Sequence, residues 1–381
     1  MSKNRLNLPV VNNLARRYLV SLISAVVLSL IFVSTGQTAN KDSVKLYDGW
    51  TELMYASWRG QHDTVTKLIN KPHHINAADI DGRTALIYAA WNGHSEIAKD
   101  LLSDGATINL QDKNGLSALA WAAKQNQLDT LKLLHSRGGQ IDIQDVKGYT
   151  PLTWATLLNH RPTVRYLLEN GANPNIKTKK GNTPLSIAAG LGYRQIVQLL
   201  LRYGAAINSA NEQGYTAMWF AADNGKFATL KLLVKSGANI DFVDRKGQTP
   251  LMRAIKGNYK EIATWLINHG AETNHTSKME NTAAHFAAMR GNSSVIQALL
   301  DAGIPVDAAN KTGNTPLQLA VKGGFVKTTE LLLRNNADIT HANLLGETAL
   351  DIARDENHKE LVNLIKTYAN SSGILDRLLS K

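Results

Sequence analysis

The sequence predicts an all-α solenoid, in which short helix pairs stack on one another along the chain. The first observation is that the pentapeptide GNTPL occurs at residues 181–185 and again at residues 313–317, so the two copies start four 33-residue periods apart. The second is that alanine recurs on the same 33-residue period, without a slip, from Ala56 to Ala353. The third is that a unit of this length cannot bury its own apolar face, so neighbouring units must stack.

Each 33-residue unit is predicted to form a tight turn, two helices and a loop. A leading glycine such as Gly181 permits the positive φ of the turn. Thr183 is a good helix N-cap, and Pro184 suits the first helical position, where no N–H is needed. Apolar residues four, seven and eight positions after the leading glycine form the apolar face of the first helix. A leucine-rich second helix follows. Residues 46–375 hold about ten such units, and residues 376–381 form a short tail.

Two stretches carry a family resemblance. They are GRTALIYAAWNGHSEIAKDLLSDGATIN at residues 82–109 and GNTPLSIAAGLGYRQIVQLLLRYGAAIN at residues 181–208. Both resemble the G-x-T-P-L-H-x-A-A and L-L-x-x-G-A-x-x-N pattern of the ankyrin repeat family, and the resemblance covers about 330 of the 381 residues. It implies an ankyrin-repeat solenoid of stacked helix-turn-helix units with projecting β-turn fingers. It also implies that partners bind to a concave face formed by the fingers and the first helices.

The N-terminal segment, residues 1–39, reads as a signal peptide or a membrane anchor. Arg16 and Arg17 precede an uncharged apolar run at residues 18–33, and small residues follow. This order is typical of a secretory signal. The sixteen apolar residues would span about 24 Å as a helix, less than a hydrocarbon core of about 30 Å. The long lead before the run keeps an uncleaved anchor as the alternative. In both cases we expect the repeat array to be exported.

The sequence offers no recognisable catalytic or cofactor site. It contains no cysteine, which excludes disulfides, thiolate metal sites and cysteine nucleophiles. It has no G-x-S-x-G, H-E-x-x-H, phosphate-loop or G-x-G-x-x-G motif, and no insertion interrupts the period to house a catalytic loop. The pair His73–His74 is the one candidate for a metal site, and it lacks an obvious third ligand. We therefore expect no enzyme activity, metal or cofactor.

Candidate binding residues follow from the positions that the resemblance assigns to the concave face. Aromatic residues concentrate near the N-terminal fingers, whereas basic residues run along the middle and C-terminal fingers. Aromatic and arginine side chains surrounded by charge are typical of protein interfaces. We expect Trp50, Trp58 and Trp91 to be exposed. The candidate protein-binding surface consists of Trp50, Trp58, Arg59, Trp91, Lys147, Tyr149, Lys180, Tyr215, Arg245 and Lys246.

Another set of aromatic residues is predicted to lie in the core between repeats. These residues occupy the position six after the leading glycine, and they are Tyr88, Trp121, Trp154 and Phe220. Trp219, one position earlier, fits either the core or the surface.

The eighth unit departs most from the repeat pattern. Glu280 replaces its leading glycine, and the usual proline and leucine are missing. We expect residues 283–288 to be the least stable joint of the array. This unit also carries His285, the single histidine at the T-P-L-H position, where the resemblance implies local hydrogen bonding.

The predicted function is an exported, non-enzymatic scaffold that binds one or more proteins through its concave face. An exported chain made almost entirely of such repeats is similar to bacterial envelope proteins, so we expect the periplasm. The alternative is an adaptor anchored in the inner membrane, which contacts the membrane only if the N-terminal segment is retained. A net charge of +11 favours an acidic partner surface without indicating nucleic acid. A further alternative is an acidic ligand bound by basic finger residues such as Lys147, Lys180 and Lys246.

Overall fold

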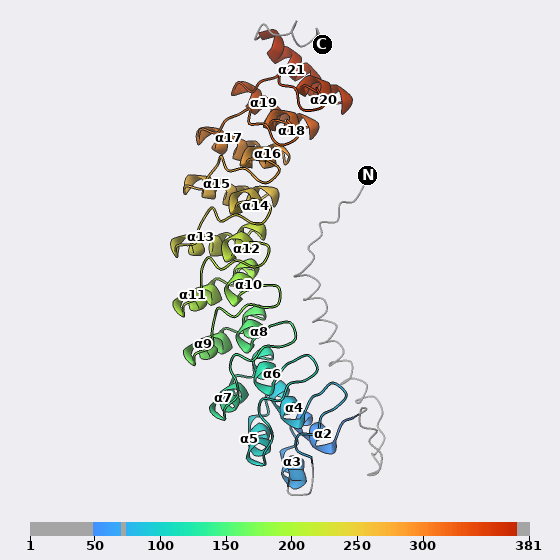
Figure 1. Ribbon diagram of the computed structural model, residues 1–381, viewed down its shortest axis with the longest axis vertical. Coiled ribbons are helices and arrows are strands. Elements are labelled where there is room, and N and C mark those ends of the chain that lie inside the picture. Colours follow the sequence, from blue (N-terminus) through green and yellow to red (C-terminus); the bar gives the residue numbers. More distant parts are fainter. Residues whose placement is uncertain (1–48, 70–73, 372–381) are drawn as a thin grey trace. The chain divides into compact units, whose positions relative to one another are not determined.

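The computed structural model describes residues 49–69 and 74–371, which form twenty α-helices and no strand (Figure 1). The predicted leader at residues 1–39, His73 and the predicted tail at residues 376–381 lie outside the described residues. No described helix has both the length and the apolar character needed to cross a membrane.

The helices alternate along the chain between a first and a second helix of each unit. The first helices are α2 (Glu52–Arg59), α4 (Ala85–Asn92), α6 (Ala118–Lys124), α8 (Pro151–Leu157), α10 (Pro184–Leu191), α12 (Ala217–Asp223), α14 (Pro250–Lys256), α16 (Ala283–Ala288), α18 (Pro316–Lys322) and α20 (Ala349–Asp355). The second helices are α3 (His62–Ile69), α5 (Ser95–Ser103), α7 (Leu128–Ser136), α9 (Arg161–Glu169), α11 (Arg194–Arg202), α13 (Phe227–Lys235), α15 (Lys260–Asn268), α17 (Ser293–Asp301), α19 (Val326–Arg334) and α21 (Lys359–Ser371).

The helices lie in two layers, which we call the inner layer (first helices) and the outer layer (second helices). Each first helix packs against the next first helix as well as against its own second helix. Figure 1 shows the loops that precede the first helices projecting away from the outer layer. These loops are the predicted fingers. The all-α solenoid predicted from the 33-residue period is confirmed.

Local chemistry explains where the first helices begin and what they bury. In α10 the Thr183 hydroxyl accepts the backbone N–H of Ser186 over 3.2 Å, and Pro184 occupies the first turn. Ala188 is fully buried, and so is Leu200 of α11. A larger side chain at Ala188 would separate helices that approach closely, so the repeated alanine sets the spacing of the stack.

The backbone conformation of the leading turn favours glycine. Gly148 has a φ of 76°, and a Cβ atom there would lie 2.7 Å from the backbone nitrogen of Lys179. Glu280 takes the same left-handed conformation with a φ of 57°, although it carries a side chain. The eighth unit therefore adopts the same left-handed turn as the other units, although it has Glu280 where glycine would suit the turn better.

Backbone hydrogen bonds link successive fingers. The N–H of Lys113 donates to the carbonyl oxygen of Asp81 over 2.8 Å, and that of Lys179 donates to Lys147 over 2.9 Å. Equivalent bonds join Lys278 to Lys246 over 2.9 Å. The side chains at the finger tips are thus carried by a connected backbone instead of by separate loops.

In the eighth unit, His285 performs the local hydrogen bonding that its position implies. Its side chain is fully buried, and Nδ1 accepts the backbone N–H of Thr282 over 3.1 Å. Nε2 lies 3.0 Å from the carbonyl oxygen of Asn314, so Nε2 carries the proton and ties this unit to the next. Helix α16 contains six residues and is the shortest described helix.

The predicted inter-repeat aromatic core is confirmed at three of four positions. Tyr88, Trp121 and Trp154 are buried, with 2%, 5% and 3% of their surface exposed. The prediction for Phe220 is wrong, because this side chain is half-buried. Its neighbour Trp219 is buried instead, since its indole reaches a carboxylate in the next finger.

Candidate protein-binding surface

A continuous series of side-chain contacts crosses the fingers and inner-layer helices at the N-terminal end of the array. We call it the aromatic ladder, and it consists of Trp58, Trp50, Tyr88, Trp91, Trp121, Lys124, Trp154 and Tyr149.

Ring contacts join three successive repeats within this ladder. The ring centroids of Trp50 and Tyr88 are 4.4 Å apart, and those of Tyr88 and Trp91 are 6.3 Å apart. Trp91 then stacks on Trp121, with centroids 4.0 Å apart and an interplanar angle of 7°. Favourable aromatic pairs add about 0.5–1.5 kcal/mol beyond the burial of their area. The ladder is therefore one connected set of ring contacts across these repeats.

The expectation that Trp50, Trp58 and Trp91 are exposed is wrong. All three are half-buried, because each ring lies against another ring of the ladder. Trp58 and Trp50 meet edge to face with centroids 5.8 Å apart. Large aromatic rings are covered by one another here, and only part of each remains available to a partner.

Cations lie over several rings of the ladder. The Arg83 guanidinium carbon is 5.2 Å from the ring centroid of Trp91 and 5.7 Å from that of Trp121. The Lys124 ammonium lies between two indoles, 4.3 Å from the centroids of Trp121 and Trp154. These are the distances of cation–π attraction. Arg59 is exposed, and its guanidinium carbon lies 5.7 Å from the centroid of Trp58.

Burial changes the acidity of Lys124. It lowers the pKa of the ammonium to about 8, although the carboxylates of Asp112 and Asp145 oppose this shift. Burial likewise raises the pKa of Tyr88, whose hydroxyl also donates to Asp79.

A buried carboxylate at the base of a finger holds the ring of the same repeat. One oxygen of Asp112 accepts the backbone N–H groups of Asn114 and Leu116, each over 2.9 Å. Its other oxygen accepts the indole N–H of Trp121 over 3.0 Å. The equivalent pairs are Asp79 with Tyr88 at 2.5 Å and Asp145 with Trp154 at 3.1 Å. One side chain thus fixes both the finger and the orientation of the ring.

A second, smaller aromatic cluster lies in α12 and α14 and the adjacent fingers. Tyr215 stacks on Trp219, with centroids 3.6 Å apart and an interplanar angle of 12°. The Arg253 guanidinium carbon lies 4.7 Å from the centroid of Trp219 and forms an ion pair with Asp223. The predicted site residue Tyr215 thus belongs to this cluster and not to the aromatic ladder.

The remaining predicted site residues are at the finger tips. Lys147, Lys180, Arg245 and Lys246 are all exposed. Ring and cation contacts bring together five of the predicted site residues, Trp50, Trp58, Arg59, Trp91 and Tyr149. We call the four exposed cations at the finger tips the basic strip.

Two cations of these clusters, Arg83 and Arg253, did not follow from the sequence argument. Both occupy register positions that hold aromatic residues in other units. Arg83 corresponds to Trp50 and Tyr149, directly after the leading glycine, and Arg253 corresponds to Trp121. Their repeat positions, compared between units, were enough to predict that these arginines lie beside aromatic rings of neighbouring units.

The described residues contain no group of three or more side chains that could hold a metal ion. His74 is exposed, and its neighbour His73 is outside the described part of the chain.

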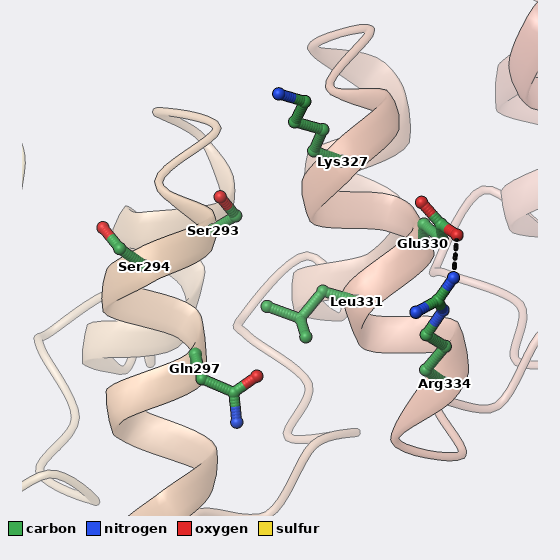
Figure 2. Close-up of a pocket in the computed structure, with 7 residues that line it drawn as sticks. All are labelled: Ser293, Ser294, Gln297, Lys327, Glu330, Leu331 and Arg334. Carbon is green, nitrogen blue, oxygen red and sulfur yellow. Dashed lines mark hydrogen bonds and ion pairs between the residues drawn. The ribbon is translucent and has the colours of Figure 1, made fainter.

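Two of the hollows in the described part of the chain lie on the outer layer. One lies between α17 and α19, where Figure 2 shows Ser293 and Ser294 on one helix and the pair Glu330–Arg334 on the other. Its volume is about 360 Å³. The other lies along α7, α9 and α11 and has a volume of about 600 Å³. Neither hollow includes a residue of the candidate surface predicted from the sequence.

Comparison with known proteins identifies the repeats. A family model described as "Ankyrin repeats (3 copies)" matches residues 21–112, 105–178, 170–244, 220–310 and 284–373. A search of curated proteins finds no match. Ankyrin repeats generally act as protein-interaction scaffolds, and proteins built from them are typically non-enzymatic. With most of its length matched and with the helix pairs and fingers described above, this chain belongs to the ankyrin repeat family.

Proposed function

We propose that this protein is an exported, non-enzymatic scaffold that binds a protein partner through the concave face formed by its fingers and inner-layer helices. The observation that carries the proposal is the aromatic ladder, in which half-buried Trp50, Trp58 and Trp91 lie beside Arg59 and Arg83. Tryptophan, tyrosine and arginine dominate the binding energy of protein interfaces.

The mechanism is rigid presentation. Ring stacking, buried carboxylates and the bonds between fingers hold the ladder in one conformation before any partner arrives. Association then orders few additional side chains, each of which would otherwise oppose binding by about 0.5–1.5 kcal/mol. The exposed part of each tryptophan supplies contact area, and the exposed Arg59 supplies positive charge beside Trp58.

We further propose that residues 46–375 contain ten repeats and that residues 1–39 direct export to the periplasm. The basic, apolar and small residues in succession support a cleaved signal peptide. Retention of the segment would instead give an adaptor anchored in the inner membrane. The intact mass of the protein purified from its native source distinguishes the two, because cleavage removes the chain up to Gly36 or Ala39.

Site-specific crosslinking tests the interaction surface. A photoreactive phenylalanine analogue in place of exposed Arg59 is expected to capture a defined partner from cell-envelope extracts. The same analogue in place of Lys231, on the outer-layer helix α13, serves as the control position. The proposal fails if Arg59 and Lys231 capture the same proteins, or if Trp58→Ala leaves the Arg59 crosslink unchanged.

A second candidate function is the binding of an acidic ligand by the basic strip of finger tips. The exposed cations Lys147, Lys180 and Lys246 favour it. Affinity should then fall steeply with salt and be lost in the triple glutamine variant, whereas Trp91→Ala should have little effect. The opposite pattern, with loss in Trp91→Ala and little salt dependence, supports the aromatic ladder as the binding surface.

A further inference from the structure

The groove along α7, α9 and α11 collects positive charge on the outer layer, away from the aromatic ladder and the fingers. It has a volume of about 600 Å³, and the side chains that matter for its chemistry are Lys132, Arg161, Arg165, Tyr166, Glu169 and Arg202. A hollow of this size is within the range of small-molecule sites, about 300–1,000 Å³.

Three of its cations lack an acidic partner among the residues that the structure describes. Arg161, Arg165 and Arg202 are exposed, and within the described ranges none of them forms an ion pair. Lys132 is close to a carboxylate, with its Nζ 3.6 Å from Asp129, and Glu169 is the sole acid among the residues that line the groove. Uncompensated guanidinium groups along one groove repel one another, and a bound anion would relieve that repulsion.

The repeat architecture by itself does not produce this charge. The hollow between α17 and α19 lies at the same register, four 33-residue repeats later, so Ser293, Gln297 and Arg334 correspond to Arg161, Arg165 and Arg202. Two of the three arginines are replaced there by neutral residues. Figure 2 shows the remaining one, Arg334, facing Glu330. The two side chains form an ion pair in which nitrogen and oxygen are 2.5 Å apart. Unpaired cations are therefore a property of the α7–α11 groove.

The groove also offers a neutral, partly apolar wall. The Tyr166 hydroxyl lies 3.1 Å from Nδ1 of His135, and the two rings meet edge to face with centroids 5.9 Å apart. The Tyr166 hydroxyl is uncharged near neutral pH, and burial raises its pKa further. Leu199 lies in the same wall and is buried. This wall can contact the uncharged body of a ligand while the arginines bind its anionic groups.

We infer that the groove formed by α7, α9 and α11 binds a small molecule that carries two or more anionic oxygen groups, either phosphate or carboxylate. Arginine is suited to both, because its planar guanidinium donates two parallel hydrogen bonds to a pair of oxygens. Arg161 and Arg165 on α9 and Arg202 on α11 supply three such donors from two adjacent repeats. The site is independent of the concave face proposed above.

Isothermal titration calorimetry on the full chain tests this inference with two probes. Pyrophosphate represents the phosphate source and citrate the carboxylate source, both at low ionic strength because salt screens exposed charges. We expect saturable binding of at least one probe with a stoichiometry of one. The double variant Arg165→Gln, Arg202→Gln should weaken this binding at least tenfold, and both substitutions are at exposed positions that leave the core intact.

The matched control is Arg334→Gln in the α17–α19 hollow, where the arginine is already paired. Binding should change less than twofold in this variant. The inference is overturned if neither probe binds, or if Arg334→Gln weakens binding as much as the double variant. Binding of pyrophosphate alone assigns the site to phosphates, and binding of citrate alone assigns it to carboxylates. Circular dichroism of each variant confirms that the fold is retained.

Discussion

The indole of Trp219 in α12 donates a hydrogen bond to Asp244 in the finger of the following repeat, with 3.2 Å between the two atoms. The other oxygen of Asp244 accepts the backbone N–H groups of Lys246 and Gln248 over 2.8 Å and 2.9 Å. The Asp244 side chain is buried, so a single carboxylate shapes one finger and links it to the previous helix. The other finger aspartates that hold rings do so within their own repeat.

Replacing Asp244 should therefore destabilise the array strongly. Asp244→Ala leaves the indole N–H and two finger N–H groups without their partner, and each unsatisfied buried group costs about 1–3 kcal/mol. We expect the free energy of unfolding to fall by about 2–4 kcal/mol, measured by urea denaturation with tryptophan fluorescence. Glu212→Ala, at an exposed finger tip, is the control and should change it by less than about 0.5 kcal/mol. Equal free energies of unfolding for the two variants would show that the hydrogen bonds of Asp244 do not stabilise the array.

The turn at Glu280 predicts a stabilising substitution. Glu280 has a φ of 57°, a conformation that costs a residue with a Cβ about 1–2 kcal/mol relative to glycine. Part of this gain is offset by the greater freedom of glycine in the unfolded chain, so Glu280→Gly should raise the free energy of unfolding by about 0.5–1 kcal/mol.

Gly148→Ala is the reverse substitution and should lower stability by at least about 2 kcal/mol. Here the positive φ coincides with a Cβ that would lie 2.7 Å from the backbone nitrogen of Lys179. Thermal denaturation measures both changes. A loss of stability in Glu280→Gly would mean that the glutamate side chain makes a stabilising contact of its own.

The buried His285 predicts that the array loses stability in mild acid. Burial lowers the pKa of His285 below its ordinary value of 6.5. The unfolded chain therefore binds more protons than the folded chain as the pH falls through 6.5, and the free energy of unfolding decreases there. Urea denaturation at pH 7.5, 6.5 and 5.5 should reveal this decrease.

His285→Gln separates this effect from other titrations. Gln318 occupies the equivalent position one repeat later, where it accepts the N–H of Thr315 over 2.9 Å and donates to the carbonyl oxygen of Glu347 over 2.8 Å. Glutamine can thus replace the histidine hydrogen bonds without titrating. The variant should show a smaller decrease between pH 7.5 and 5.5 than the wild type, and an identical decrease would exclude His285 as its source.

The sequence was sufficient for the fold because each repeat position has a local function. Thr183 caps its helix by accepting the backbone N–H of the residue three positions later. Ala188 is fully buried in the same helix. Such relationships recur with the period, so ten weak signals reinforce one another. Trp121 and Trp154 share one repeat position and are both buried, as that position predicts.

The candidate site was only partly predictable because its contacts depend on side-chain direction across repeats. Trp91 was expected to be exposed, but it stacks on Trp121 of the following repeat. Trp219 fitted either the core or the surface, and it is buried because its indole donates to Asp244 in the next finger. Arg165 and Arg202 line the same groove only because α9 and α11 pack side by side. Each of these contacts joins residues of adjacent repeats, so predicting it requires the side-chain directions in both repeats.

The eighth unit should open more readily than its neighbours. Helix α16 has six residues, whereas α14 and α18 have seven each, and its leading turn contains the strained Glu280. Local opening of a repeat exposes its amides without unfolding the whole array. In native-state hydrogen exchange we expect amides in residues 283–288 to exchange faster than those in residues 250–256. Similar protection of the two segments would contradict a weak joint, and Glu280→Gly should reduce the difference.

Lys124 should titrate far below an ordinary lysine. Burial between Trp121 and Trp154 lowers its pKa from 10.5 to about 8, despite the opposing charges of Asp112 and Asp145. Between pH 8 and 10.5 the unfolded chain retains a proton that the folded chain has lost, so the free energy of unfolding should rise with pH in this window. Carbon-13 NMR of the lysine side chains, assigned with Lys124→Met, should give a midpoint near pH 8. The variant should also lack the rise in stability, and a Lys124 midpoint above 10 would mean that cation–π and carboxylate attraction outweigh burial.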